Sequence, residues 1–188
     1  MGVYCNQVKI DINYDWQKLK SAIQKILLLK DQHTDMSDDG AAIHYYYGSL
    51  GAISDHKDSN QWLRLSGPVV QLAAPGIVEF VNSLTDLQID NWSISVLTGD
   101  GAEHVDRAST PSALNFIIEC SDMESYAWVN DNGICETYPS EVNTAWILDT
   151  QHPHGIKNNG VRYTLSIHFQ IPYNELKEWF KIKGLLIE

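Results

Sequence analysis

The sequence Arg162-Tyr163-Thr164-Leu165-Ser166-Ile167-His168-Phe169-Gln170 alternates polar and apolar side chains along its whole length. In an extended strand, successive side chains point to opposite faces, so the polar side chains share one face and the apolar ones share the other. One interpretation is an ordinary half-buried strand that turns its polar face to water. The other is a β-cup, in which the polar face lines a pocket and helices cover the apolar face.

A second pattern ends where this strand begins, in the segment His152-Pro153-His154-Gly155-Ile156-Lys157-Asn158-Asn159-Gly160-Val161-Arg162. Two histidines precede the arginine here, and a His-x-Asp pair, His104-Val105-Asp106, stands about fifty positions earlier. Two imidazoles and one carboxylate can hold a metal ion on one face and leave three positions open. The order of these residues therefore predicts a metal site, followed by a cation that anchors an acidic ligand.

A His-x-Asp pair alone is weak evidence, because the sequence also contains the pairs His33/Asp35 and His56/Asp58. Both of those pairs lie in polar segments, and neither has a downstream histidine and arginine at a suitable distance. His104 and Asp106 follow a predicted strand, Trp92 to Leu97, and precede another, Ala113 to Glu119. In extended backbone their side chains share one face and can reach one metal ion. We therefore assign His104 and Asp106, and not the other pairs, to the metal.

Arg162 is the candidate anchor, because a planar guanidinium binds a carboxylate through two parallel hydrogen bonds. Thr164 lies two residues further along the same face and can add a hydroxyl hydrogen bond. A 2-oxo acid can chelate a metal through its keto oxygen and adjacent carboxylate, which leaves one position for dioxygen. Its far carboxylate then requires a fixed cation.

These motifs resemble those of the Fe(II)/2-oxoglutarate-dependent oxygenases of double-stranded β-helix fold. The segment His154-x-Ile156-x-Asn158, followed by Arg162, is similar to the H-x-V-x-N…R segment of the aspartyl/asparaginyl β-hydroxylase-like branch. Residues 112–117 resemble the strand that follows the first ligands in that branch. The resemblance covers Trp92 to Phe169, which is under half of the chain.

The resemblance implies an enzyme that uses Fe(II), 2-oxoglutarate as cosubstrate, and dioxygen. It implies hydroxylation of an unactivated C–H bond, with an amino acid, free or within a peptide, as the best substrate class. Asp106 favours hydroxylation over halogenation, because related halogenases leave the position of this carboxylate open for chloride. The alternatives are a non-catalytic cupin-like domain that binds a small acid or a protein, and a metal cupin enzyme that uses no 2-oxoglutarate.

The choice of distal ligand depends on spacing. In this family the distal histidine and the anchoring arginine usually stand about ten residues apart, whereas His154 precedes Arg162 by eight positions and His152 by ten. A tight Asn159-Gly160 turn would shorten the predicted hairpin by two residues and preserve the facing of the side chains. We therefore favour His154 as the distal ligand and retain His152 as the alternative.

Further candidates follow from their positions near these motifs. Asn115 is a candidate cosubstrate contact, and Arg107, Tyr126 and Trp128 are candidate substrate contacts. Core or rim positions explain Asn115, Tyr126 and Trp128 equally well, and an exposed arginine is common on protein surfaces. His168, on the polar face of the strand, is interpreted as a hydrogen-bonded wall residue and not as a ligand.

The chain changes character near Trp92. Before it, the pattern predicts a strand over Val8–Ile12, then a helix to Lys30 capped by Asn13 or Asp15, and then a loop over Asp31–Gly40. Two strands follow, over Ala42–Tyr47 and Trp62–Leu65, with a loop over Ser54–Asn60 between them. A second helix begins at Pro75. After it come strands over Trp92–Leu97, Ala113–Glu119, Ser125–Val129, Thr144–Leu148 and Arg162–Phe169. Asp131-Asn132-Gly133 and Asn158-Asn159-Gly160 have hairpin-turn chemistry. A last helix is predicted over Glu175–Lys183, capped by Asn174 and ended by Gly184.

Together these elements predict one α+β domain over residues 1–188. Residues 1–91 form a helical and edge-strand support, residues 92–170 the metal-bearing β core, and residues 171–188 a C-terminal helix. By the resemblance, the core is a double-stranded β-helix (jelly-roll or cupin-like) backed by N-terminal and C-terminal helices.

Composition limits the partners. The formal net charge is −11 and hydrophobic residues make up 44%, so the chain is globular, and its acidity argues against a nucleic-acid groove. Cys5, Cys120 and Cys135 have no metal-site spacing, which predicts free thiols. The sequence shows neither a secretion signal nor a membrane span. We therefore expect a cytoplasmic protein with a small-molecule or peptide substrate.

Overall fold

A computed structural model describes residues 3–29, 35–36, 42–46, 51–55, 61–65, 67–131 and 133–187. The first elements are β1 (Cys5–Val8), α1 (Trp16–Leu29), β2 (Asp35–Met36), β3 (Ala42–Tyr46), β4 (Gly51–Asp55), β5 (Gln61–Leu65), α2 (Gly67–Ala73) and α3 (Pro75–Ser83). They are followed by β6 (Ile89–Thr98), β7 (Gly101–His104), β8 (Ser112–Cys120), β9 (Tyr126–Asp131), β10 (Ile134–Pro139), β11 (Ala145–Asp149), β12 (His154–Lys157), β13 (Val161–Phe169) and α4 (Tyr173–Ile182).

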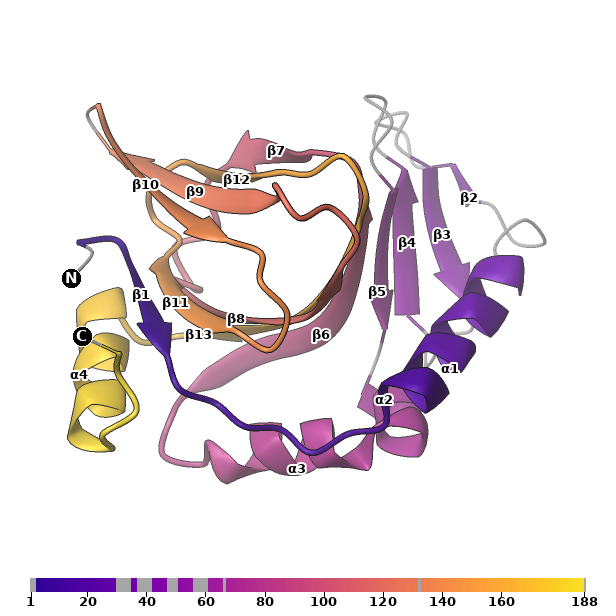
Figure 1. The fold of residues 1–188 in the computed structure, drawn as a ribbon, viewed down its shortest axis with the longest axis horizontal. Helices are drawn as coiled ribbons and strands as arrows, with labels where there is room; N and C mark the ends of the chain where they lie inside the picture. The colour runs from indigo at the N-terminus through magenta and orange to yellow at the C-terminus, as the bar shows by residue number, and fades with distance from the viewer. Residues whose placement is uncertain are drawn as a thin grey trace.

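The described strands form two antiparallel sheets that face each other. The larger sheet has the order β1-β11-β8-β13-β6-β5-β4-β3-β2, and the smaller has the order β10-β9-β12-β7. Figure 1 shows the smaller sheet lying across from β11, β8, β13 and β6. The predicted double-stranded β-helix is therefore confirmed.

Strand β13 lies at the centre of the larger sheet, paired with β6 on one side and β8 on the other. Its apolar face is buried: Leu165, Ile167 and Phe169 are 0% exposed. Residues of α1, α3 and α4 belong to the same core cluster, and Figure 1 shows these helices on the outer side of the larger sheet. Because burial of each such side chain contributes about 1.5–3 kcal/mol, this face fixes the register of the strand and turns its polar face inward.

Several predicted boundaries were wrong by a few residues. The N-terminal strand is Cys5–Val8, not Val8–Ile12, because the chain leaves the sheet after Val8 and the backbone N–H of Lys9 donates to the carbonyl of Leu185 (2.7 Å). At the start of α1, Asp15 is the residue that caps, with its carboxylate accepting from the backbone N–H of Lys18 (3.1 Å). At the other end of the chain, α4 begins at Tyr173 after Pro172, without a side-chain cap from Asn174, and Gly184 (φ 68°) follows its end.

Other elements were missed. Helix α2 and strands β4, β7 and β10 were not predicted, and β2 lies within the segment predicted as a loop over 31–40. Ser54 and Asp55, predicted as loop, belong to β4. The remaining residues of those two segments, including His33 and His56, lie outside the described residues, as do Lys30 and Tyr47.

The two predicted hairpin turns have different outcomes. The turn after Asp131 does connect a hairpin, because β9 and β10 pair from Asp131 and Ile134 onward and Gly133 has φ 90°. The segment Asn158–Gly160 does not: β12 pairs with β7 and β9, whereas β13 pairs with β6 and β8. It is a corner at which the chain crosses from the smaller sheet to the larger one, and the hairpin prediction was wrong.

Side chains hold this corner in place. The Asn158 amide bonds both backbone groups of Gly160: its Oδ1 accepts from the N–H (3.1 Å) and its Nδ2 donates to the carbonyl (2.9 Å). The carboxylate of Asp100 accepts from the backbone N–H of Asn158 (2.8 Å), and that of Asp122 accepts from the backbone N–H of Asn159 (2.7 Å). A Cβ on Gly160 would collide with Oγ of Ser121, which accepts from the backbone N–H of Val161 (2.8 Å), so a side chain there would displace that contact.

The state of the cysteines and the character of the helices bear on two further expectations from the sequence. Cys5, Cys120 and Cys135 are free thiols. Within the part of the chain that the structure describes, no helix has the length and apolar character needed to span a membrane.

Candidate metal centre

Strands β7 and β12 bring two histidines together. His104 ends β7 and is paired with His154, which begins β12, and their ring centroids lie 4.3 Å apart. Asp106 follows β7, where its backbone N–H donates to the carbonyl of Thr150 (3.0 Å). Oδ1 of Asp106 lies 3.6 Å from Nε2 of His104 and 4.0 Å from Nε2 of His154. One ligand atom from each of the three residues lies within 4.8 Å of the others.

The His154 ring is oriented by the backbone. Its Nδ1 lies 2.9 Å from the carbonyl oxygen of His152. With the proton on Nδ1, this hydrogen bond leaves the lone pair on Nε2, which faces Asp106. Burial lowers the pKa of His154, against a smaller opposing effect of the His152 carbonyl. The imidazole is therefore held neutral, as metal binding requires.

His152, the alternative distal ligand, lies elsewhere. Its Nδ1 is 3.6 Å from Oδ1 of Asp131, its Nε2 is 3.7 Å from Oδ2 of Asp149, and its ring contacts the ring of Tyr4 at 4.5 Å between centroids. It does not line the cavity that contains His104, Asp106 and His154. The structure thus brings together three of the four predicted metal-site residues.

Asp106 has a further neighbour that the sequence did not reveal. Nδ1 of His168 in β13 lies 3.3 Å from Oδ2 of Asp106. Burial raises the pKa of the Asp106 carboxyl, but His168, His154 and His104 together outweigh it and lower the pKa below its usual value. Asp106 is therefore an ionised carboxylate, the form that binds a cation. His168 is a wall residue, as interpreted, and its particular contact is with a candidate ligand.

The candidate ligands lie on a cavity between the two sheets, with about 750 Å³ of empty space that includes its open mouth. Polar side chains of β13 form part of the wall: Arg162, Thr164, Ser166 and His168. Across the strand pairing, Ser95 stands opposite Thr164 and Ser93 opposite Ser166. The β-cup interpretation of this strand is therefore the correct one.

Arg162 is the most unusual group in the cavity. It is 2% exposed, and among the described residues its Nε and Nη2 have no hydrogen-bond partner. Burial lowers its pKa, against the opposing influence of Tyr138 and Cys120. Because an unpaired buried cation costs several kcal/mol, this guanidinium requires an anion. A site of two histidines and one carboxylate, in the same cavity as a buried arginine unpaired at Nε and Nη2, fits a divalent metal ion with an acidic ligand.

The side chains around Arg162 supply further hydrogen-bonding groups. Thr164 is buried on the cavity wall, and Nδ2 of Asn115 lies 3.5 Å from the hydroxyl of Tyr138. Tyr138 lines the cavity and is 2% exposed. Tyr138 was not predicted, because β10 was not predicted; the available signal was the predicted Asp131–Gly133 turn, which implies a returning strand.

The three predicted substrate contacts do not line this cavity. Arg107 is exposed, and its carbonyl accepts from the backbone N–H of Thr110 (2.9 Å). Tyr126 is 39% exposed. Trp128 packs against Gly155, where a Cβ would lie 2.7 Å from its Cζ2 and 3.1 Å from the carbonyl of Gly101. Trp128 therefore supports β12 next to His154.

The sequence matches no protein-family model and no curated protein. The fold is similar to that of a Pseudomonas putida prolyl-4-hydroxylase, with TM-score 0.52 and 8% identity over 89% of this chain and 93% of that one. It is also similar to EvdMO1, with TM-score 0.53 and 15% identity over 90% of this chain, which spans 47% of that chain. An oxidoreductase of the 2OG-Fe(II) oxygenase family from Burkholderia pseudomallei gives TM-score 0.46 and 12% identity over 79% of this chain and 78% of that one. At these identities, the two similarities with TM-scores above 0.5 show the fold alone.

Proposed function

We propose that this chain is an Fe(II)- and 2-oxoglutarate-dependent oxygenase, with His104, Asp106 and His154 as its metal ligands. The observation that carries the proposal is Arg162, a buried guanidinium unpaired at Nε and Nη2 in the same cavity as those three side chains. A ligand with an acid group at each end can bind the metal and also neutralise this cation. A 2-oxo diacid such as 2-oxoglutarate has that form.

Each protein group has a distinct role in this proposal. When bound, Fe(II) together with 2-oxoglutarate and dioxygen supplies the oxidising chemistry that hydroxylates an unactivated C–H bond. Arg162 binds the far carboxylate of the cosubstrate through two hydrogen bonds, and Thr164 and Asn115 add neutral contacts. His168, 3.3 Å from Oδ2 of Asp106, limits the orientations of this carboxylate. The facing sheets exclude water from the Arg162 end of the cavity.

The branch and the substrate class rest on the sequence. The segment His154-x-Ile156-x-Asn158, followed by Arg162, supports a place with the aspartyl/asparaginyl β-hydroxylase-like enzymes, and hence an amino acid, free or in a peptide, as substrate. The structure gives the asparagine in this segment a physical role, because the Asn158 amide closes the corner that precedes Arg162. The wider fold similarity gives no preference for a branch.

The test is succinate formation from 2-oxoglutarate by the purified protein with Fe(II) under air, followed by NMR without any added substrate. We expect slow, Fe(II)-dependent succinate formation that is lost in His154→Ala and in Arg162→Ala. Binding of metal without binding of 2-oxoglutarate would instead favour a metal enzyme that uses no 2-oxoglutarate. A protein that binds no divalent metal would be a non-catalytic β-cup.

A further inference from the structure

The N-terminal segment Val3–Cys5, here called the N-terminal clamp, is held by a single carboxylate. Glu136 in β10 accepts hydrogen bonds from three consecutive backbone N–H groups: those of Val3 (2.6 Å), Tyr4 (2.8 Å) and Cys5 (3.0 Å). Burial raises the pKa of Glu136, but these N–H groups lower it more, so the carboxylate is ionised. Charge-assisted bonds of this kind are stronger than neutral ones, which makes the attachment specific.

Tyr4 extends the clamp towards the candidate metal centre. Its hydroxyl donates to Oδ2 of Asp131 (2.6 Å), and its carbonyl accepts from the backbone N–H of Asp149 (2.8 Å). Its ring contacts the ring of His152 at 4.5 Å between centroids. Tyr4 therefore touches the ends of β9 and β11 and the loop that precedes β12.

His152 connects the clamp to the distal ligand. Its ring stands between Asp131 and Asp149, the same two residues that Tyr4 bonds. Its carbonyl oxygen accepts from Nδ1 of His154, and the next carbonyl, that of Pro153, accepts from the backbone N–H of Asn130 (2.8 Å). The side chain of His152 thus fixes the peptide whose oxygen orients the His154 ring.

We infer that the N-terminal clamp positions the distal metal ligand, so that docking of Val3–Cys5 and binding of the metal are thermodynamically coupled. The positioning residues are Glu136, Tyr4 and His152, which act through the His152 carbonyl on His154 and do not touch the metal. This inference rests on the proposed ligand set. Coupling of two equilibria is reciprocal: the factor by which the docked clamp raises metal affinity is the factor by which metal favours docking.

The first test is the Kd of Mn(II), measured by isothermal titration calorimetry, for two variants that release the clamp, Glu136→Gln and Tyr4→Ala. We expect about a three- to tenfold weaker Kd in each, below the 10- to 100-fold typical of groups that contact a metal ligand directly. Tyr4→Phe keeps the ring against His152 and should recover part of the loss. His152→Ala should lose as much as Tyr4→Ala or more, and still bind metal.

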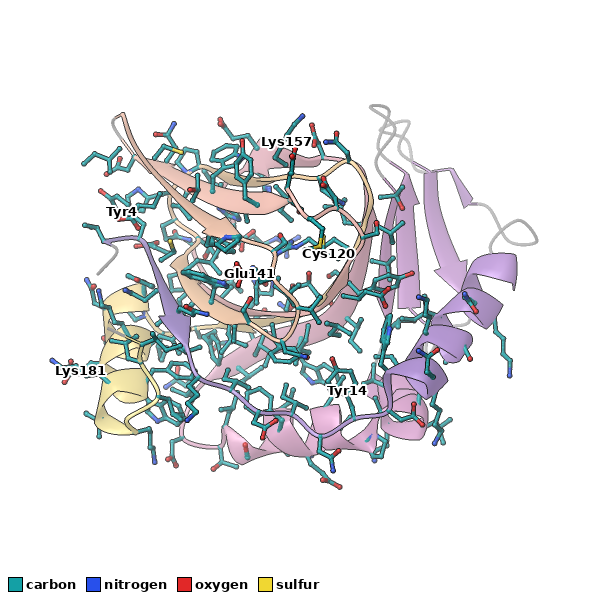
Figure 2. The ribbon with its side chains drawn as sticks, in the orientation of Figure 1. Tyr4, Tyr14, Cys120, Glu141, Lys157 and Lys181 are labelled. Atoms are coloured by element: carbon teal, nitrogen blue, oxygen red, sulfur yellow. The ribbon has the colours of Figure 1, made fainter. Side chains whose placement is uncertain are left out.

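Matched controls separate positioning from general destabilisation. Glu141→Gln makes the same change at an exposed position, and Tyr14→Ala removes a ring that packs on Phe116 in the core region. Figure 2 labels Tyr4, Tyr14 and Glu141 and shows Tyr14 far from Tyr4, near the start of α1. Both controls should leave the Mn(II) Kd within twofold of wild type, even where the melting temperature falls.

A second measurement uses the unmodified chain and needs no folded variant. Hydrogen exchange of the Val3, Tyr4 and Cys5 amides should slow several-fold when Mn(II) saturates the site. Unchanged exchange there, with protection appearing around His154, would overturn the inference and leave the metal site standing. An unchanged Kd in folded Glu136→Gln and Tyr4→Ala would do the same. Absence of Mn(II) binding to the wild type would overturn the proposed function itself.

Discussion

Nδ1 of His168 lies 3.3 Å from Oδ2 of Asp106, while the two candidate histidine ligands approach the other oxygen of that carboxylate, Oδ1, at 3.6 and 4.0 Å. The two oxygens of this carboxylate therefore have different neighbours. Oδ1 faces His104 and His154, and Oδ2 faces His168 on the cavity wall. His168 comes from β13, the strand that also carries Arg162, so a single strand contributes to both ends of the site.

This contact predicts that His168 tunes metal binding without being a ligand. Replacement by phenylalanine keeps the approximate shape but removes the imidazole that lies 3.3 Å from Oδ2 of Asp106, an atom with no hydrogen bond among the described residues, so Mn(II) affinity should fall by about 10- to 100-fold. His168→Asn, which retains a donor, should lose less. Calorimetric Kd values for the two variants check this, and equal affinities for wild type and His168→Phe would contradict it.

The distal ligand is tested by two single variants. His154→Ala removes a proposed ligand and should weaken Mn(II) binding by more than the roughly 100-fold upper range of outer-shell effects. His152→Ala removes only a positioning group and should retain measurable binding. Metal content of the two purified proteins, measured side by side, decides between them. Loss of metal only in His152→Ala would make His152 the ligand.

Arg162→Lys tests the anchor. The substitution keeps a positive charge but loses the planar pair of donors, so 2-oxoglutarate affinity should fall by one to two powers of ten, or about 1.5–3 kcal/mol for a charge-assisted contact. Metal affinity should barely change. The matched control is Arg107→Lys, at an exposed arginine outside the cavity, which should bind 2-oxoglutarate like wild type. Calorimetry on Mn(II)-loaded protein measures both constants.

Glu136 gives a prediction for pH. Its folded-state pKa lies below the ordinary value, so its contribution to stability is present above the unfolded pKa of roughly 4.3 and is lost as pH falls through the folded-state pKa. Near neutral pH the free energy of unfolding of Glu136→Gln should therefore be lower than that of wild type by about 1 kcal/mol, the difference between a charged and a neutral acceptor. The gap should close at acidic pH. Thermal melts of both proteins from pH 3 to pH 7 test this; a gap independent of pH would contradict it.

The strand Arg162–Phe169 shows how far the sequence could go. Its strict alternation identified both faces, because a polar face that lines a cavity and an apolar face under helices leave a pattern with period two. The alternation did not show that Oδ2 of Asp106 would meet His168, since that contact joins positions more than sixty residues apart. Tyr138 was not predicted for a related reason: Glu136 and Thr137 before it are polar, and its strand is defined by pairing with β9 across the Asp131–Gly133 turn.

The segment Asn158–Gly160 shows where local chemistry misleads. Asparagine and glycine indicate a tight turn, and a bend between two sheets is what forms, because turn residues do not specify which strands pair on either side. The corner explains why His154 can lie at the site although it stands only eight positions before Arg162. We favoured His154 because a tight turn would shorten a hairpin by two residues. That reason is wrong, because β12 and β13 pair in different sheets and form no hairpin.

The same corner sets the separation between two groups of the site, His154 and Arg162. His154 lies on one sheet and Arg162 on the other, and the Asn158 amide with the carboxylates of Asp100 and Asp122 fixes the short segment between them. In the proposed function, an acid held by both the metal and Arg162 must span the distance that this corner sets. A diacid one carbon shorter or longer than the matching one is then expected to leave either the metal or the guanidinium unsatisfied, so a corner remote from any reacting atom would select among acids.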